Sequence, residues 1–473
     1  MKTENSSVIS QEPPVEELQP IIQLYTEGEL HKALFQTNQM LERLTNSAAL
    51  LDLAAACNLG LTQFKAAINN YEQLLKITPN NSEAHNNLGY CLYKIGILES
   101  AIDSYKQAVL IKPDFAQAYY NLGLTYFDAG KIEAAIDSYK KALLIKPDYA
   151  EAYNNIGTVL RERGEYDEAL EYYNKLLLIQ PNSADAYYNI GVTMLDKGEL
   201  DKSLVSLKYA LEIKPDFAEV AFNLSALTTT TSESIAWVEY CLKVNPSHLD
   251  AKLMLSALKF YEGDKSNFNE LKQSHIKDHP FMRSFAWVFG LTKLPRLHFH
   301  RWAFFDHVVE KSKINRPFYE FGVWRGESFR YLLKTFKKGY GFDTFTGLPE
   351  NWHSVKEGNY SNNGNIPEIN GGEFIVGKFN DTLPIFFSEH RPMASVINFD
   401  ADLYSSTICA LNCSKPIIDK HTILIFDEFL MNENWEQDEY KALNEFCLQN
   451  NYSYEVLEVS FITKQVAMRL ISI

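Results

Sequence analysis

The sequence has few of the features that mark secreted, membrane-spanning or metal-clustering proteins. Its 473 residues include six cysteines, none of them in a Cys-x-x-Cys pair, which disfavours a zinc site or a disulfide framework. No stretch approaches the ~18 apolar residues that a transmembrane helix needs, and the first residues lack the layout of a signal peptide. We therefore expect a cytoplasmic protein with no transmembrane segment.

Positive charge is scarce relative to negative charge. The chain carries 45 Lys and Arg against 60 Asp and Glu, a net charge of −15. Sequence-independent nucleic-acid binding depends on a basic surface, so we expect no nucleic-acid partner. Hydrophobic residues make up 46% of the chain, which is ordinary for a globular protein and argues against disorder over most of its length.

The first half of the chain repeats every 34 residues. Prolines keep this spacing at Pro79, Pro113, Pro147, Pro181 and Pro215. Glycines keep it at two positions of the unit, namely Gly89, Gly123, Gly157 and Gly191, and Gly96, Gly130, Gly164 and Gly198. The first glycine allows two helices to approach closely, the second helps to end the first helix, and the proline stops the second helix.

This pattern resembles tetratricopeptide repeats. The resemblance covers residues 13–250 and is best in the units 81–114, 115–148, 149–182 and 183–216. The unit that begins at Phe217 lacks the glycines, and we expect it to cap the array. Residues 1–12 are predicted to be a flexible N-terminus, and residues 251–315 a helical connector.

Asparagine also recurs in the repeats, one residue before Leu-Gly or its equivalent. The five positions are Asn87, Asn121, Asn155, Asn189 and Asn223. An amide both donates and accepts hydrogen bonds, so this column suits a protein or peptide bound on the concave face of a solenoid. It resembles the asparagine ladder of O-linked N-acetylglucosamine transferases. The alternative is that the amides bond between repeats, or are neutral positions shared through duplication.

From residue 316 the pattern alternates between strands and helices, which is typical of a mostly parallel sheet. Strands are predicted at 316–322, 339–343, 373–379, 394–400, 421–427, 452–461 and 464–473. Helices are predicted at 326–338, 381–390, 404–415 and 438–450. The last two strands are close in sequence, and we expect them to form an antiparallel hairpin at the sheet edge.

The first turn of this region favours a nucleoside cofactor other than a nicotinamide. It lacks the Gly-x-Gly-x-x-Gly of dehydrogenases and instead has Glu320, Gly322 and Gly326, followed by Ser328. The glycines allow close approach to the backbone, and the helix start offers amide donors to a carboxylate. Asp343 ends the second strand, where a carboxylate can accept hydrogen bonds from both ribose hydroxyls.

Six runs resemble, in order, the macrocin O-methyltransferase family of class I methyltransferases. They are FYEFGVWRGESF, GFDTFTGLPE, GKFNDTLP, NFDADLYSST, LIFDEF and EYKALNEF. The resemblance covers residues 316–473 and implies S-adenosylmethionine as cofactor, a divalent cation, usually Mg²⁺, and a sugar hydroxyl as acceptor. The fold expected for the whole chain is an all-α tetratricopeptide solenoid followed by an α/β Rossmann-like class I methyltransferase domain.

Two acidic pairs end two neighbouring strands of the predicted sheet. Asp400 and Asp402 follow one strand, and Asp427 and Glu428 follow the other. Carboxylates held this close repel one another unless a cation or proton lies between them, and Mg²⁺ prefers oxygen ligands. The resemblance implies that Asp400, Asp427 and Glu428 are metal ligands and Asp402 the general base, although the family usually has aspartate in place of Glu428. The alternative is that these residues cap helices.

Residues 351–372 form a polar run without periodicity. Loops of this length in a compact domain are usually functional or disordered, and we expect this one to be a lid over the acceptor. His353 is a candidate second acid–base group.

We therefore expect a repeat solenoid joined to a metal-assisted O-methyltransferase that acts on a sugar or glycan-like hydroxyl. Two alternatives remain open. One is a protein or peptide methyltransferase whose solenoid supplies the substrate, and the other is a repeat adapter with an inactive methyltransferase fold.

Overall fold

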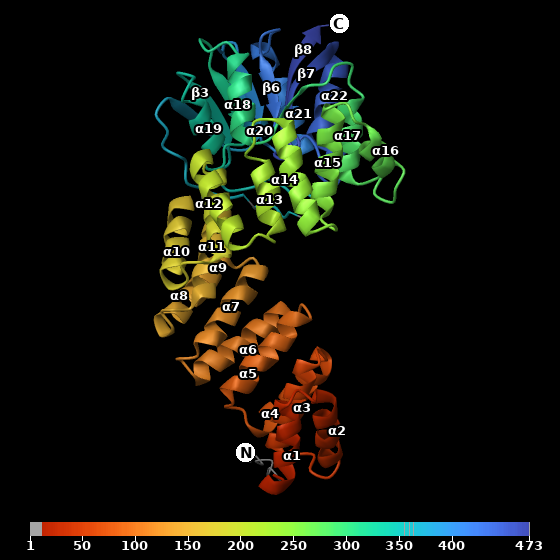
Figure 1. Ribbon diagram of the computed structural model, residues 1–473. Helices are drawn as coiled ribbons and strands as arrows, with labels where there is room; N and C mark the ends of the chain where they lie inside the picture. The colour runs from red at the N-terminus through yellow and green to blue at the C-terminus, as the bar shows by residue number, and fades with distance from the viewer. Residues whose placement is uncertain (1–11, 354, 359, 363, 473) are drawn as a thin grey trace. The chain divides into compact units, whose positions relative to one another are not determined.

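The computed structural model describes residues 12–353, 355–358, 360–362 and 364–472 (Figure 1). The predicted flexible N-terminus lies outside them except for Glu12. The chain forms two compact units that divide between Thr193 and Met194. This division falls inside the repeat array and upstream of residue 250, where the period of 34 residues fades.

The N-terminal unit consists of consecutive helix pairs. Its helices are α1 (Val15–Thr26), α2 (Leu30–Leu41), α3 (Ala48–Gly60), α4 (Phe64–Ile77), α5 (Ser82–Lys94), α6 (Leu98–Ile111), α7 (Ala116–Asp128), α8 (Ile132–Ile145), α9 (Ala150–Glu162), α10 (Tyr166–Ile179) and α11 (Ala184–Asp196), whose last turn belongs to the second unit.

The recurring glycines do what their spacing predicts. A Cβ atom on Gly157 would lie 2.5 Å from the ring of Tyr173 on the paired helix, so only glycine allows this close approach. Gly130 has a φ of 72° just after α7, a conformation that favours glycine at a helix end. The period of 34 residues therefore sets both the packing within each pair and the turn between its helices.

Helices of the C-terminal unit fall into two sets. The first is α12 (Leu200–Ile213), α13 (Ala218–Ser225), α14 (Thr231–Val244), α15 (Leu249–Tyr261), α16 (Ser266–Lys272), α17 (Pro280–Phe289) and α18 (Arg301–Glu310). The second is α19 (Glu327–Leu332), α20 (Phe379–Phe386), α21 (Tyr404–Ser414) and α22 (Glu439–Asn450), with short 3-10 turns at Lys415–Ile417 and Trp435–Gln437.

An eight-stranded sheet forms the centre of this unit, in the order β1-β7-β8-β6-β5-β2-β3-β4. Its strands are β1 (Arg296–His298), β2 (Phe318–Phe321), β3 (Gly339–Asp343), β4 (Gly372–Val376), β5 (Val396–Phe399), β6 (Ile423–Phe426), β7 (Tyr452–Ser460) and β8 (Val466–Ser472). Within the described sheet, β8 alone runs antiparallel to its neighbours.

The prediction that the final hairpin forms the sheet edge was wrong. Strand β1 pairs in parallel with β7, Leu297 opposite Val459, and takes the edge position. This strand is three residues long and lies in the segment predicted to be a helical connector, so it leaves no alternating pattern in the sequence.

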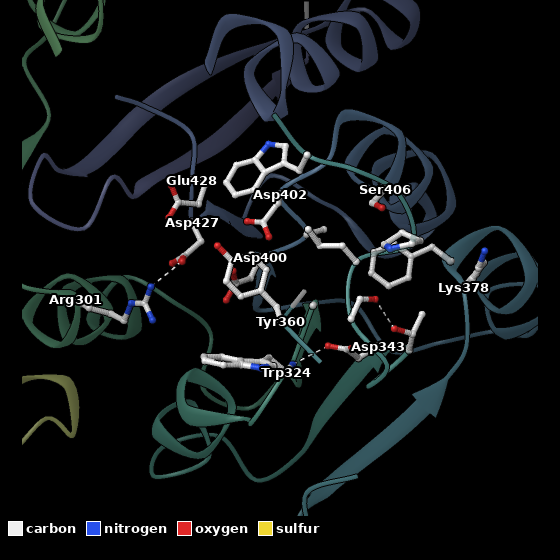
Figure 2. A pocket seen from close by; sticks show the side chains of 18 residues that line it. Arg301, Trp324, Asp343, Tyr360, Lys378, Asp400, Asp402, Ser406, Asp427 and Glu428 are labelled. Atoms are coloured by element: carbon white, nitrogen blue, oxygen red, sulfur yellow. Dashed lines mark hydrogen bonds and ion pairs between the residues drawn. The ribbon is translucent and has the colours of Figure 1, made fainter. Parts of the chain in front are cut away.

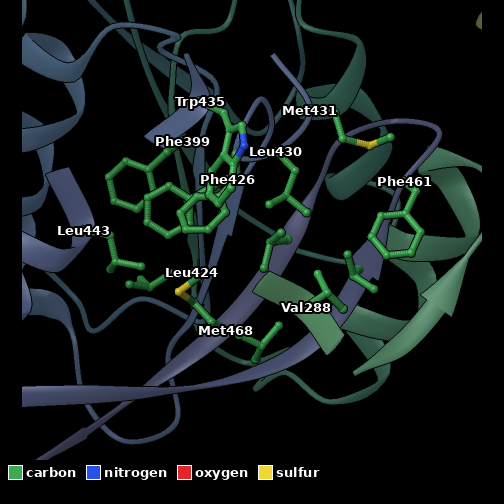
Figure 3. Packing of buried hydrophobic residues seen from close by; sticks show 14 of the residues in the cluster. Val288, Phe399, Leu424, Phe426, Leu430, Met431, Trp435, Leu443, Phe461 and Met468 are labelled. Carbon is green, nitrogen blue, oxygen red and sulfur yellow. The ribbon is translucent and has the colours of Figure 1, made fainter. Parts of the chain in front are cut away.

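Helices cover both faces of the sheet. Along β6, Ile423 and Ile425 pack into one cluster with residues of α18 and α19. Leu424 and Phe426 point the other way, into a cluster with residues of α20, α21 and α22 (Figure 3). This alternation follows from the period of two in a strand, and burial on both faces explains why β6 reads as a continuous apolar run.

The last repeat helices share that second cluster. Ala221 of α13, Val238 of α14 and Leu258 of α15 belong to the same buried cluster as Phe426 of the sheet. The unit from Phe217 was expected to cap the solenoid. Its helices, α13 and α14, pack into the core of the C-terminal unit through these buried residues.

Candidate active site

A pocket of about 290 Å³ lies at the carboxyl ends of the parallel strands (Figure 2). Residues that follow or end β2, β3, β4, β5 and β6 line it, together with one helix of the upstream segment. The lining residues are Arg301, Gly322, Trp324, Asp343, Thr344, Gly347, Leu348, Pro349, Trp352, Tyr360, Lys378, Phe379, Asp400, Ala401, Asp402, Ser406, Asp427 and Glu428.

Gly322 lies where the strand order reverses direction along the chain. Strand β2 has β3 on one side and β5 on the other, and ligands of open α/β sheets bind in the crevice at such a point. Gly322 has a φ of 89°, and a Cβ atom there would lie 1.8 Å from the carbonyl oxygen of Asp400. Only glycine therefore fits between the ends of these two strands.

Asp343 ties the glycine turn to the end of β3. Its Oδ2 accepts hydrogen bonds from the backbone N–H groups of Val323 and Trp324, both at 2.7 Å. Its Oδ1 accepts one from the N–H of Phe345 at 2.7 Å. The carboxylate of Asp343 thus lines the pocket and also holds the turn in place. The sequence predicted only a role in ribose binding, and the contacts within the turn are an additional role.

Three candidate cofactor residues do not line the pocket. Gly326 is the N-cap of α19 with a φ of 76°. Glu320 is fully buried in β2, and its Oε1 accepts a hydrogen bond from the Ser328 hydroxyl at 2.6 Å. Burial raises the pKa of Glu320 to about 8, although the bond from Ser328 opposes the shift. These three residues lie on the strand and the helix start that flank the turn, outside the pocket lining.

The acidic residues do come together. Asp400, Asp402, Asp427 and Glu428 all line the pocket (Figure 2). Burial, and then the neighbouring Glu428, raises the pKa of Asp402 to about 8. Burial and Asp427 raise the pKa of Asp400 well above its usual range. The pairing of two strand ends therefore predicted this cluster correctly.

Two of the four carboxylates of this cluster, Asp427 and Glu428, are already paired with other side chains. The Arg301 guanidinium donates to Asp427 Oδ2 at 2.7 Å, and the Gln465 amide donates to Asp427 Oδ1. Lys464 Nζ lies 3.0 Å from Glu428 Oε2. Within the described residues, no group of three or more His, Cys, Asp and Glu side chains is arranged to hold a metal ion. The donor set as it lies does not fit the expected Mg²⁺.

The polar run 351–372 contributes two aromatic residues to the pocket, Trp352 and Tyr360. The ring of Tyr360 meets that of Trp324 edge-on, with 6.1 Å between their centroids. His353 does not join them, because its Nε2 lies 2.7 Å from Asp438 Oδ2 and the residue is not part of the lining. The structure thus gives no acid–base position to His353.

Sequence reasoning missed several pocket residues. Arg301 comes from α18, far upstream of the strand ends, and nothing in its local pattern marks it. Trp324 and Tyr360 have φ values of 47° and 58°, and the predicted base Asp402 has one of 56°. This left-handed conformation is uncommon for such side chains and clusters at functional sites. The indole N–H groups of Trp324 and Trp352 are buried and have no hydrogen-bond partner among the described residues.

The asparagine column makes contacts within the protein. Asn121 Nδ2 donates to Asn86 Oδ1 at 3.0 Å, and Asn189 Nδ2 donates to Asn154 Oδ1 at 2.7 Å. Each of these bonds joins one repeat to the preceding one. These contacts agree with the alternative interpretation of the column, in which the asparagine amides form hydrogen bonds between repeats.

Other members of the column vary in their contacts. Asn155 Nδ2 donates to the Tyr120 hydroxyl at 3.1 Å, again across a repeat boundary. Asn87 Oδ1 accepts from Asn86. Asn223 Nδ2 donates to the Glu219 carbonyl within its own helix.

Family models match the helical repeats. The model described as tetratricopeptide repeat matches residues 114–180 and 148–216, and the model described as TPR repeat matches residues 61–96 and 92–130. The N-terminal region is a tetratricopeptide repeat array. No curated protein matches the sequence.

Several solved structures are similar to part of this chain. MamA is 34% identical over 36% of this chain and 94% of its own, with a TM-score of 0.34. YrrB, described as a TPR protein with an unusual peptide-binding site, is 23% identical over 39% of this chain and 95% of its own, with a TM-score of 0.35. A repeat protein from Cytophaga hutchinsonii is 18% identical over 50% and 99%, with a TM-score of 0.43.

Tetratricopeptide arrays present extended concave surfaces that typically bind proteins or peptides. The N-terminal region of this chain is thus of a kind suited to protein interaction. Among the helices of the described residues, none has the length and apolar character needed to cross a membrane.

Proposed function

We propose that this protein is a tetratricopeptide repeat adapter whose C-terminal unit is an S-adenosylmethionine-dependent methyltransferase. The observation that carries the proposal is the pocket at Gly322 and Asp343, which lies at the point where the strand order of the sheet reverses. It contains two indole donors that have no partner among the described residues. The order β4-β3-β2-β5-β6 supports the proposal, because doubly wound nucleotide-binding sheets use this order.

The pocket suits a nucleoside cofactor with a positively charged group. Gly322 allows the ends of β2 and β5 to meet at the pocket, and Phe379 and Trp324 supply aromatic surface. The side chains of Asp400 and Asp402 make no hydrogen bond or ion pair with the described residues, and burial raises the pKa of both, so that a bound cation would favour their ionised forms. When bound, S-adenosylmethionine supplies an electrophilic methyl group on a sulfonium.

Asp402 is the proposed base for the acceptor. With the cofactor bound, Asp402 would be placed to take the proton of the acceptor hydroxyl as that oxygen is methylated. A base works best with a pKa near the working pH, and the pKa of Asp402 is about 8. A sugar or glycan-like hydroxyl is the proposed acceptor, and a side chain of a peptide held by the repeats is the alternative.

A second candidate is an adapter without methyltransferase activity. The comparisons favour it, since every family-model match lies within residues 61–216. In this case the repeats would bind a protein partner and the pocket would bind no cofactor. The two candidates differ in a single measurable property, the affinity for S-adenosylmethionine.

Calorimetric titration of the full chain with S-adenosylmethionine tests the proposal, with NAD as control ligand. We expect micromolar binding that Gly322→Arg abolishes, because the arginine side chain cannot fit beside Asp400. Asp343→Ala should weaken it at least tenfold. Asp381→Ala, which replaces an exposed acidic residue of α20, serves as the matched control and should bind like the wild type.

Folding of each variant is checked by tryptophan fluorescence. Absence of S-adenosylmethionine binding by a folded wild-type chain would refute the methyltransferase and favour the adapter.

A further inference from the structure

We infer that Arg301 and Lys464 are built-in counter-ions of the acidic pocket, and that this pocket works without a divalent cation. The inference concerns the charge of the site and holds whether or not methyl transfer takes place there. It follows from three features of the structure: how Arg301 is held, how Lys464 is held, and that each of them pairs with one of the two acidic residues after β6.

Arg301 reaches the cluster from the first turn of α18. Its guanidinium donates to Asp427 Oδ2 at 2.7 Å, and its side chain is 33% exposed whereas that of Asp427 is 6% exposed (Figure 2). Asp427 in turn raises the pKa of the guanidinium. A charge-assisted bond to a nearly buried carboxylate is among the stronger polar contacts in proteins.

The helix that carries Arg301 is firmly packed. Trp302, Phe304 and Phe305 are buried in one cluster with Phe318 and other residues of the sheet. The His300 Nδ1 accepts the N–H of Ala303 and caps the helix start at 3.1 Å. The position of Arg301 is thus fixed by the core, and its contact with Asp427 does not depend on a mobile side chain alone.

Lys464 reaches the cluster from the turn between β7 and β8. Its Nζ lies 3.0 Å from Glu428 Oε2 and 2.8 Å from Asn432 Oδ1. Its backbone has a φ of 60°, so the turn holds this residue in an uncommon conformation. The neighbouring Gln465 donates to Asp427 Oδ1, and both oxygens of Asp427 are therefore engaged.

These contacts place a positive charge beside each of the two residues that follow β6. A magnesium ion demands near-octahedral oxygen coordination, and at Asp427 it would compete with Arg301 and Gln465 for oxygens that already accept their hydrogen bonds. The two cations offset part of the negative charge of the cluster, at Asp427 and Glu428. The family resemblance predicted an ion at this place, and the side chains instead supply fixed charges.

Thermal unfolding of the full chain tests the inference through tryptophan fluorescence. Magnesium chloride at about 10 mM is compared with sodium chloride of equal ionic strength. A ligand that binds only the folded state raises the melting temperature, so we expect no magnesium-specific shift in the wild type. Arg301→Gln combined with Lys464→Gln should show a shift of several degrees, because the released carboxylates then need a cation.

Lys378→Gln is the matched control. It removes a positive charge from the same lining, on the far side of Asp343 from the acidic cluster, and should respond like the wild type (Figure 2). Should the double variant fail to fold, Mn²⁺ titration of the wild type followed by electron paramagnetic resonance keeps the question decidable. Saturable Mn²⁺ binding by the wild type that Asp427→Asn abolishes would overturn the inference, as would a folded double variant that ignores Mg²⁺.

Discussion

Glu320 combines full burial with an incomplete set of hydrogen bonds. It lies on β2 between Tyr319 and Phe321, and its Oε2 has no partner among the described residues. Burying an ionised carboxylate without compensation is expensive, so the group takes up a proton instead. The pKa of about 8 means that Glu320 is mostly neutral at pH 7. The free energy of unfolding is therefore highest below the usual carboxyl pKa, where Glu320 is protonated in both the folded and the unfolded chain. It falls as the pH rises toward 8, because the unfolded chain then loses this proton more readily than the folded chain.

Replacement of Glu320 by glutamine tests this at the residue scale. The amide would mimic the neutral acid and keep an oxygen for Ser328, so Glu320→Gln should stabilise the C-terminal unit by about 3 kcal/mol at pH 7. Below about pH 4.5 the difference should nearly vanish, because both the folded and the unfolded wild type are then largely protonated. Melting temperatures of wild type and variant, followed by tryptophan fluorescence from acidic to slightly alkaline pH, check this. A difference that stays constant with pH would contradict it.

Helices and strands with strong periodicity were predictable, and contacts between distant elements were not. The 34-residue period gave the helix pairs, and the apolar runs gave every strand of the sheet except β1. Helix α19 ends at Leu332, six residues before the predicted end at 338, although Phe336 beyond it still packs against Phe318 of β2. Strand β1 is too short to leave a pattern. The pair of Arg301 and Asp427 spans 126 residues, and no local pattern can reveal it.

The asparagine column likewise combines a spacing that was predictable with contacts that were not. Its spacing was visible in the sequence, but its partners depend on how one repeat rotates against the next. Asn121 lies on α7 and Asn86 on α5, so their bond joins the first helices of successive repeats. Asn121 is 9% exposed, and the loss of a buried amide partner costs more than the loss of an exposed one. The column therefore contributes to the stiffness of the stack.

A double-mutant cycle measures this contribution. Asn121→Ala and Asn86→Ala should each destabilise the repeats by about 1–2 kcal/mol, with a coupling of about 1 kcal/mol between them. Urea unfolding followed by far-ultraviolet circular dichroism is the measurement. Gln107→Ala, at an exposed position of α6, is the control and should change little. Additive effects in the cycle would show that the amides do not act through their mutual bond.

At the scale of the whole molecule, the six tryptophans are distributed unevenly. They are Trp237, Trp287, Trp302, Trp324, Trp352 and Trp435, and all lie in the C-terminal unit, residues 194–473. The N-terminal unit is a stack in which each repeat contacts its neighbours, and such stacks unfold with limited cooperativity. The C-terminal unit is held by a sheet whose strands pair across long sequence separations. Tryptophan fluorescence therefore reports on one unit, and circular dichroism on both.

We expect the two signals to give different unfolding curves in guanidinium chloride. Fluorescence should show one steep transition, and circular dichroism an additional, broader phase from the repeats. S-adenosylmethionine at about 100 times its dissociation constant should stabilise the fluorescence transition by about 2.7 kcal/mol and leave the broad phase unchanged, since the pocket is built only from residues of the C-terminal unit. Coincident curves, or a ligand shift of both phases, would mean that the repeats and the sheet unfold as one body, and that a partner bound to the repeats acts directly on the stability of the pocket.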